Sequence, residues 1–169
     1  AEGLAAGFQR DGFVRPGRVE LVRRGKLAEA LVSPRSARQF GVAANGANGE
    51  ESPESLDLAA GELPRGRVLE SLDRGIYVGN LWYLNFSDRS AYRITGMTRF
   101  ASFWVEGGEI REPLDVMRFD DTAYRLLGSE LEALTTERDL LLNGGSYGAR
   151  NTASVRTPGA LLRSLKLVL

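Results

Sequence analysis

The stretch GIYVGNLWYLNFSDRSAYRITGMTRFASFWVEGG, which spans Gly75–Gly108, holds both tryptophans of the chain and six other aromatic residues. The eight aromatic side chains are Tyr77, Trp82, Tyr83, Phe86, Tyr92, Phe100, Phe103 and Trp104. Aromatic residues bury large areas and dominate the energetics of cores, so we expect this stretch to form the core of the fold. Two apolar, strand-like runs flank the polar tetrapeptide Ser87–Ser90, which is typical of a turn. If the stretch has a functional role, we expect it to depend on this polar insert and on the internal arginines Arg93 and Arg99.

The segment near the N-terminus predicts a hairpin. Arg18–Val22 alternates polar and apolar residues, as a half-buried strand does. Arg23–Lys26 contains a glycine suited to a tight turn, and Leu27–Val32 is then the return strand. Because the LAEAL sequence also has good helix propensity, a short helix over Lys26–Leu31 is the alternative.

A helix of one or two turns is predicted for Ser33–Gly41. Ser33 is a favoured N-cap, Pro34 suits the first helical position, and Gly41 can end the helix. The Asn- and Gly-rich segment Val42–Pro53 follows and is typical of a solvated loop.

Between this loop and the aromatic stretch, Ser55–Ala60 alternates as a strand does. Leu63–Leu72 has the apolar spacing of a short amphipathic helix that ends near Gly75. Within the aromatic stretch, strands are predicted near residues 76–82, 89–96 and 99–106.

The C-terminal half continues with a hairpin turn at Glu106–Glu109, centred on Gly-Gly. Its return strand, Ile110–Val116, is broken by a proline and therefore suits a sheet edge. Phe119–Leu134 has the best helical spacing in the chain. Thr152–Arg156 and Leu161–Leu169 close the chain as strands, the last ending in a sheet. We therefore predict an α+β fold that is predominantly antiparallel β-sheet, barrel-like, with two or three short helices.

The overall composition is that of an ordinary globular protein. The chain has 169 residues, 22 basic and 22 acidic side chains and a formal net charge of zero, so a single domain over residues 1–169 is expected. A balanced charge provides no excess of basic residues to attract nucleic acid or an anionic membrane surface. With no signal peptide or spanning segment, we expect a cytoplasmic protein. Because the chain begins with Ala1 and no capping signal, we expect a fragment of a longer or processed protein.

The chain contains neither cysteine nor histidine. Disulfides, thiolate nucleophiles and imidazole-dependent zinc sites or catalytic triads are therefore excluded for this chain alone. No residue is predicted to be catalytic or to bind a metal or cofactor. The acidic pair Asp120–Asp121 is explained by the macrodipole at the start of the predicted helix.

Several segments, in order, resemble one family. RVELVRRGKLAEALVSPRSARQFG resembles a hairpin followed by a "SAR…G" helix, and LAAGELPRGRVLESLDRGIYVGNL resembles the stretch that comes next. FASFWVEGGEIREPLDVMRFDD and the Gly-rich NGGSYGARNTASVRTPGALL continue the pattern. From about Gly17 onward, the chain resembles the C-terminal domain of the TldD/PmbA family, which includes modulators of DNA gyrase and metallopeptidase-like proteins.

The resemblance implies a peptidase-related fold but not a complete active site. Active members look like zinc peptidases with an upstream HExxxH helix and a cysteine ligand in the late Gly-rich loop. This chain has no histidine, and the place of the cysteine falls on Ser146 or Tyr147. The resemblance therefore implies a member of a metal-free subgroup, similar to the subunit that partners a zinc-bearing one in a dimer.

Three functional hypotheses follow from the resemblance. In the first, the domain is non-catalytic alone and contributes to a peptide-processing chamber and to assembly with a related subunit, as a homo- or heterodimer. In the second, it is part of an active zinc metallopeptidase, a hydrolase, whose HExxxH helix lies in a missing N-terminal region, so that zinc is bound by the full-length protein or a partner subunit. In the third, it is a regulatory module that modulates gyrase, which the neutral charge does not favour.

If a peptide substrate is contacted by this chain, the exposed edge of the aromatic stretch is the expected place. Its polar and amphipathic side chains could meet an extended peptide by β-augmentation. The predicted substrate-binding residues are Asn80, Trp82, Asn85, Asp88, Arg89 and Arg99.

Overall fold

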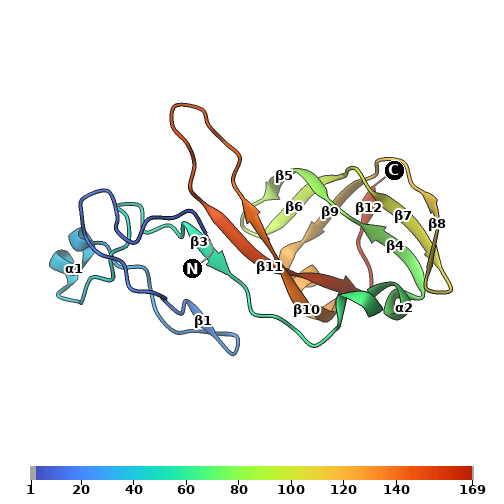
Figure 1. The fold of residues 1–169 in the computed structure, drawn as a ribbon, viewed down its shortest axis with the longest axis horizontal. Helices are drawn as coiled ribbons and strands as arrows, with labels where there is room; N and C mark the ends of the chain where they lie inside the picture. The colour runs from blue at the N-terminus through green and yellow to red at the C-terminus, as the bar shows by residue number, and fades with distance from the viewer. Residues whose placement is uncertain (1–2, 169) are drawn as a thin grey trace. The chain divides into compact units, whose positions relative to one another are not determined.

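The structure is a computed structural model, and it describes residues 3–168 (Figure 1). The chain divides into two compact units. One comprises Ala1–Leu58 and Asp139–Thr157, and the other Ala59–Arg138 and Pro158–Leu169. We call them the first and the second unit.

The first unit contains the predicted N-terminal hairpin. Strands β1 (Val22–Arg23) and β2 (Lys26–Leu27) pair antiparallel around the turn. Two backbone hydrogen bonds lengthen the pairing, from Ala28 N to Leu21 O and from Glu29 N to Glu20 O, both 3.0 Å. The hairpin is therefore confirmed, and the alternative of a helix over 26–31 is wrong.

The first unit also contains the predicted helix α1 (Pro34–Phe40). The hydroxyl of the N-cap Ser33 accepts a hydrogen bond from Ser36 N at 3.2 Å. Gly41 ends the helix in the left-handed region at φ 67°, a conformation that glycine adopts without strain. Local capping signals were sufficient to predict this helix and both of its ends.

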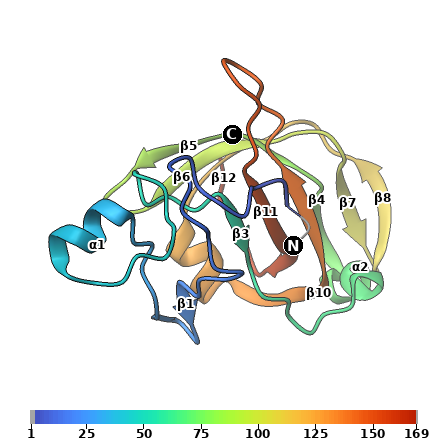
Figure 2. The ribbon, with the colours of Figure 1, turned by 60° about the vertical axis from the view of Figure 1, so that its left-hand side comes forward.

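The second unit contains a three-stranded antiparallel sheet in the order β4-β7-β8 (Figure 2). Its strands are β4 (Arg74–Val78), β7 (Ser102–Glu106) and β8 (Glu109–Pro113). Gly107 and Gly108 form the predicted turn with φ values of 61° and 72°, as a type I′ hairpin requires. β8 lies at the edge, as its proline predicted. The short helices η1 (Arg65–Arg67) and α2 (Val68–Leu72) precede this sheet.

A four-stranded antiparallel sheet in the order β12-β9-β6-β5 completes the second unit. Its strands are β5 (Leu81–Asp88), β6 (Arg93–Thr98), β9 (Arg118–Thr122) and β12 (Leu167–Val168). The pairing of β12 with β9 confirms that the C-terminal segment ends in a sheet; Leu169 lies outside the described residues.

Phe119 of β9 is the largest fully buried side chain of this sheet. It lies opposite Gly96 of β6, where a Cβ atom would be only 2.8 Å from the phenylalanine ring and 3.0 Å from Leu84. The missing side chain of Gly96 therefore creates the space in which Phe119 is buried.

The helix predicted over Phe119–Leu134 is wrong. The segment instead forms β9, a short helical stretch ending in the π-helix η2 (Arg125–Ser129), and the first part of strand β10 (Leu131–Leu142). Pairing of β9 with β6 and β12 satisfies its backbone and buries Phe119 and Asp121 together. Tertiary pairing has overridden the helical spacing.

A third sheet has the order β10-β11-β3, with β11 (Ser154–Leu162) and β3 (Ser55–Asp57). β3 confirms the strand predicted at 55–60, and β11 pairs with it in parallel. Residues of β10 and β11 belong to both units. β10 also includes the apolar run Leu140–Leu142.

The aromatic stretch is not the core that the sequence predicts. Six of its eight rings are exposed, with Tyr83 61% and Phe100 66% accessible, and only Phe103 and Trp104 are half-buried. Four strands, β4 to β7, replace the three predicted ones. The buried apolar side chains of the second unit are instead Val105, Phe119, Ala123 and Leu126. β5 is an edge strand, so its side chains lack neighbours on one side.

The α+β class with mainly antiparallel sheet is confirmed. Within residues 3–168 none of the sheets closes on itself, so the barrel-like description is not confirmed. A single domain over 1–169 stays a prediction. Over the same residues, the structure contains no helix with the length and apolar character needed to cross a bilayer.

Replacing Gly96 with alanine tests the packing of Phe119. The new Cβ atom would meet the ring at 2.8 Å, so Gly96→Ala should lower the free energy of unfolding by about 1–3 kcal/mol. Urea denaturation measures this. Gly128→Ala is the matched control, because a Cβ at Gly128 meets nothing within 4 Å. Equal stability of the two variants would contradict the packing described.

Candidate functional site

Three of the predicted site residues share one face of the four-stranded sheet. Trp82, Asn85 and Asp88 of β5 pair with Met97, Thr95 and Arg93 of β6. Residues three apart in a regular strand point to opposite faces. Two register shifts in β5, after Trp82 and after Phe86, make the seven residues Trp82–Asp88 span the five residues Arg93–Met97 of β6, and Tyr83 has a φ of 51°. These β-bulges bring the three side chains to the same face.

This face is opposite the one that buries Phe119. Cross-strand pairing with β9 adds further side chains to it, because paired residues lie on the same side of a sheet. We call this surface the open face, and it comprises Trp82, Asn85, Asp88, Arg93, Thr95, Met97, Arg118, Asp120 and Thr122.

Polar contacts link the open face across β6 and β9. Arg93 forms an ion pair with Asp120. Arg118 Nε donates a hydrogen bond to Thr95 Oγ1 at 3.4 Å, and Thr95 donates to Phe119 O at 2.9 Å. These contacts hold the polar side chains in register. These four residues were not among the predicted substrate-binding residues, although Arg93 was singled out in the sequence. The β5–β6 pairing places Arg93 and Thr95 here, and the β6–β9 pairing adds Arg118 and Asp120.

The turn predicted over Ser87–Ser90 lies at residues 89–92 in the structure. Asp88 ends β5, and Arg89 lies in the turn that follows. Asp88 Oδ1 accepts hydrogen bonds from Ser90 N at 2.8 Å and Ala91 N at 3.1 Å, as in an Asx turn. The Arg89 guanidinium lies 6.0 Å from the centre of the Phe86 ring. Asp88 therefore stabilises the turn, and the guanidinium of Arg89 lies against the Phe86 ring.

Arg99 marks the other end of β5. Its backbone N donates to Asn80 O at 3.1 Å, so two predicted site residues meet where the strand begins. Its guanidinium lies 5.1 Å from the centre of the Tyr83 ring and 6.0 Å from that of Phe100. Cation–π contacts of this kind hold the charge at the surface without neutralising it.

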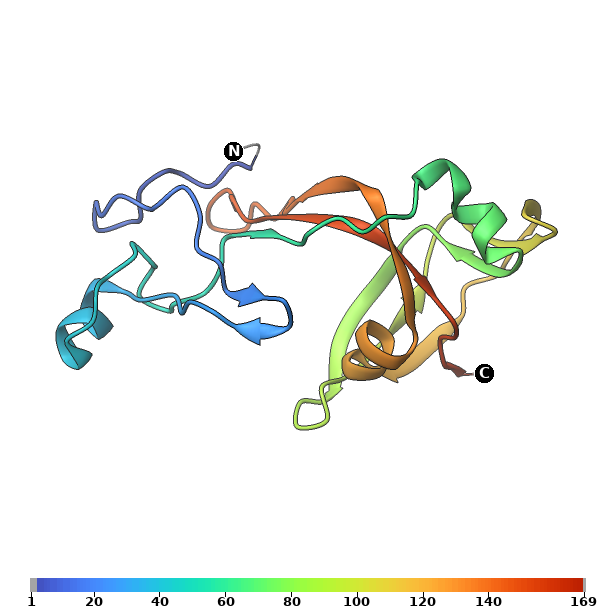
Figure 3. The same cartoon turned by 90° about the horizontal axis from the view of Figure 1, so that it is seen from below.

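Exposed rings continue the surface around the edge of the sheet. The centres of Phe86 and Tyr92 are 5.4 Å apart, as are those of Tyr92 and Tyr124. Figure 3 shows η2, in orange, beside the tip of the β5–β6 hairpin. Tyr124 was missed by the sequence analysis because it lay within the incorrectly predicted helix.

Three arginines near β5 have no carboxylate partner within residues 3–168, namely Arg89, Arg99 and Arg118. Six other arginines of the second unit form ion pairs with glutamate or aspartate. The paired arginines are Arg67, Arg74, Arg93, Arg111, Arg125 and Arg163. Unneutralised positive charge is therefore found along β5 and the open face.

The acidic pair Asp120–Asp121 is divided between the two faces of the sheet. Asp120 lies on the open face, while Asp121 is 2% exposed on the buried face. Asp121 pairs with Arg125 and accepts hydrogen bonds from Thr122 N at 2.8 Å and Lys166 N at 3.2 Å. The pair does not start a helix, and Asp121 instead anchors the C-terminal segment.

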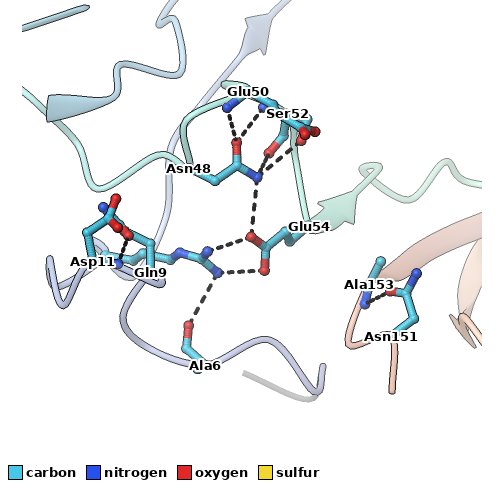
Figure 4. A network of polar contacts seen from close by, with 10 residues as sticks. Ala6, Gln9, Asp11, Asn48, Glu50, Ser52, Glu54, Asn151 and Ala153 are labelled. Carbon is cyan, nitrogen blue, oxygen red and sulfur yellow. Dashed lines mark hydrogen bonds and ion pairs between the residues drawn. The ribbon is translucent and has the colours of Figure 1, made fainter. Parts of the chain in front are cut away.

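The first unit has a polar network that the sequence analysis missed (Figure 4). Arg15 binds both carboxylate oxygens of Glu54, at 2.6 and 3.0 Å, and Asn48 Nδ2 donates to the same carboxylate at 3.3 Å. The hydrogen bond from Arg15 lowers the pKa of Glu54. Ala47 is buried, so part of the loop predicted to be solvated is folded against the unit.

Glu51 of the same loop holds the start of α1. Its carboxylate accepts a hydrogen bond from Ser33 N at 2.8 Å, and this bond lowers the pKa of Glu51. The pattern that could have revealed this loop is its repeated Asn-Gly with nearby glutamates. Those residues serve local hydrogen bonding in the structure.

The late Gly-rich loop also belongs to the first unit. Ser146 and Tyr147, at the place of the cysteine of the family pattern, are both exposed. Asn151 N donates to Gly145 O at 3.0 Å, which closes the loop. Over residues 3–168, no group of three or more His, Cys, Asp and Glu side chains is arranged to hold a metal ion.

The fold and these surfaces define an α+β, sheet-rich domain with an exposed aromatic and basic edge and no assembled metal site among the described residues. The sequence matches the family model for the PmbA/TldA metallopeptidase C-terminal domain over residues 5–168. The chain therefore belongs to the TldD/PmbA family and represents its C-terminal domain.

Solved structures have the same fold. A proposed modulator of a DNA gyrase from Thermotoga maritima MSB8 has a TM-score of 0.71 at 18% identity, over 96% of this chain and 35% of that one. TldE from Thermococcus kodakarensis has a TM-score of 0.73 at 16% identity, over 96% and 36%. A proposed modulator of DNA gyrase from Bacteroides thetaiotaomicron VPI-5482 has a TM-score of 0.64 at 16% identity, over 98% and 33%. The chain thus spans about a third of each. No curated protein matches it by sequence.

The Arg15–Glu54 pair makes a pH-dependent contribution to stability. The folded-state pKa of Glu54 lies below its ordinary value of 4.5, so the contribution is complete above that pH and is lost as the pH falls below it. At neutral pH, Glu54→Gln should lower the free energy of unfolding by about 1 kcal/mol. Urea denaturation between pH 7 and pH 3 should show the difference from wild type shrinking with acid.

Glu50→Gln is the control for this measurement, because the same loop carries Glu50 and its carboxylate makes no hydrogen bond or ion pair within residues 3–168. A Glu54→Gln effect that is independent of pH would show that the ion pair is not responsible.

Proposed function

We propose that this chain is the non-catalytic C-terminal domain of a TldD/PmbA-like, peptidase-related protein, contributing to the wall of a peptide-processing chamber and to assembly with a related subunit. The observation that carries the proposal is the absence of histidine and cysteine in a chain that belongs to this family. Ser146 and Tyr147 are poor zinc ligands, so the chain has nothing to replace the cysteine. Zinc, where it acts, would come from the rest of the protein or from a partner subunit.

The competing proposal is an active zinc metallopeptidase whose metal-binding helix lies outside these residues. The observation in its favour is length, since the chain spans about a third of the solved structures that it resembles. Modulation of gyrase is named for two of those proteins, but the zero net charge of this chain gives it no support. Cytoplasmic localisation and a dimeric state stay predictions.

Zinc content separates the two proposals. We expect the full-length protein to contain no stoichiometric zinc alone and to acquire peptidase activity only when mixed with a zinc-bearing relative. Elemental analysis of the purified protein, with and without that partner, measures this. Stoichiometric zinc and hydrolysis of a casein-derived peptide by the isolated full-length protein would favour the competing proposal instead.

We further propose that the β5 edge, with the open face, is where this domain contacts peptide. The position of β5 in its sheet supports this proposal. β5 is an edge strand with unpaired backbone groups on one side, which can receive an extended segment. The bulges interrupt that edge near Tyr83, so side-chain contacts have to supply part of the binding.

Arginine substitutions test the proposed peptide contact. Arg89→Ala and Arg99→Ala each remove an exposed or half-buried guanidinium that lies on a ring, so we expect unchanged folding and weaker binding of a fluorescent extended peptide. Fluorescence anisotropy measures affinity, and circular dichroism monitors the fold. Arg67→Ala, which removes an arginine paired with Glu70, is the control and should bind as wild type does. Loss of folding in the Arg89 or the Arg99 variant would assign that arginine a structural role.

A further inference from the structure

The β5 surface combines excess positive charge with exposed apolar side chains. Arg89 and Arg99 flank β5, and Arg118 lies on the open face beside Met97. None of the three has a carboxylate partner within residues 3–168, whereas the chain as a whole is neutral. The acidic groups on this surface are already engaged, because Asp88 caps a turn and Asp120 pairs with Arg93.

The spacing of the arginines suits an extended ligand. β5 has eight residues, which at about 3.3 Å per residue gives a strand at most about 26 Å long. The guanidinium of Arg99 lies beside the Tyr83 ring and that of Arg89 beside the Phe86 ring, so both charges border β5. An extended segment that runs along the strand would pass both groups.

The apolar side chains of β5 indicate which kind of ligand side chain would bind between the arginines. Exposed apolar side chains border β5 on both sides of the sheet, with Trp82 (46% accessible) on the open face and Leu84 (54%) and Phe86 (49%) on the opposite face. Monomeric proteins rarely leave such contiguous apolar surface uncovered unless it binds something. Apolar side chains in the ligand would fill this region.

We infer that the β5 surface binds an acidic extended protein segment, with apolar side chains between its carboxylates. The inference rests on the proposed peptide contact and specifies the chemical class of the peptide. Arginine forks match carboxylate geometry, and carboxylates of the ligand would neutralise Arg89 and Arg99, which lie against rings, and Arg118, which contacts Thr95. Single-stranded nucleic acid would also stack on exposed rings. It is less suited, because leucine side chains interrupt the rings along β5.

A set of matched peptides tests this inference on the full-length protein. The probe is a fluorescent ten-residue peptide in which three glutamates are separated by leucine and tyrosine; its relatives carry glutamine or lysine at the three positions. We expect the glutamate peptide to bind roughly five- to tenfold more tightly than the glutamine peptide, as two or three exposed arginine–carboxylate contacts would give. The difference should shrink in high salt, and the lysine peptide should bind most weakly.

Variants then locate the preference. Arg89→Gln combined with Arg99→Gln, and separately Arg118→Gln, should reduce the preference for glutamate while leaving binding of the glutamine peptide nearly unchanged. Arg111→Gln, which removes an arginine paired with Glu109 in another sheet, should not alter the preference.

Each outcome has a distinct meaning. Equal binding of the glutamate and glutamine peptides, weakened by Arg99→Ala, would overturn the acidic preference and leave the proposed peptide contact standing. Failure of every peptide to bind would overturn both. Tighter binding of a fluorescent oligothymidine than of any peptide would overturn the inference in favour of nucleic acid. An acidic preference that survives the arginine variants would place the acid-binding surface elsewhere and also contradict the inference.

Discussion

The packing of Phe119 against Gly96 is the contact on which the second unit depends. A residue with a side chain at position 96 would collide with the ring, so the pairing of β6 with β9 and the burial of Phe119 require each other. The same register places Asp121 on the buried face, where Arg125 and the backbone of Lys166 satisfy its carboxylate. A buried charge without such partners would be costly. One close contact thus fixes the strand order, the C-terminal segment and the side of the sheet that faces solvent.

The open face follows from that register. Once Phe119 and Asp121 point inward, Arg118 and Asp120 must point outward, and the bulges of β5 add Trp82 and Asn85 to the same side. The basic, aromatic character of the surface is therefore a consequence of how the core is built. The chain belongs to a family described as metallopeptidases, and this surface is the one that we propose for peptide contact.

The first unit depends on polar contacts more than on apolar packing. Ala47 is its only buried hydrophobic residue within the part of the chain that the structure describes. The Arg15–Glu54 pair, Asn48 and the contact of Glu51 with Ser33 hold its segments together. Several apolar side chains of this unit are exposed, including Leu27 and Phe40. A small core contributes little free energy, and hydrogen bonds to charged groups contribute correspondingly more.

The sequence alone determined the features that depend on neighbouring residues. Ser33, Pro34 and Gly41 specified a helix, and the glycines of Gly107–Gly108 specified a hairpin, because capping and positive φ are local requirements. The order of short motifs was sufficient to recognise the family, and the absence of histidine and cysteine excluded the usual zinc ligands. Tertiary structure decided the rest. Phe119–Leu134 has helical spacing, but its first part became a strand because pairing with β6 and β12 buries Phe119. The aromatic rings lie at an edge, and bulges that no local pattern specifies brought Trp82, Asn85 and Asp88 to one face.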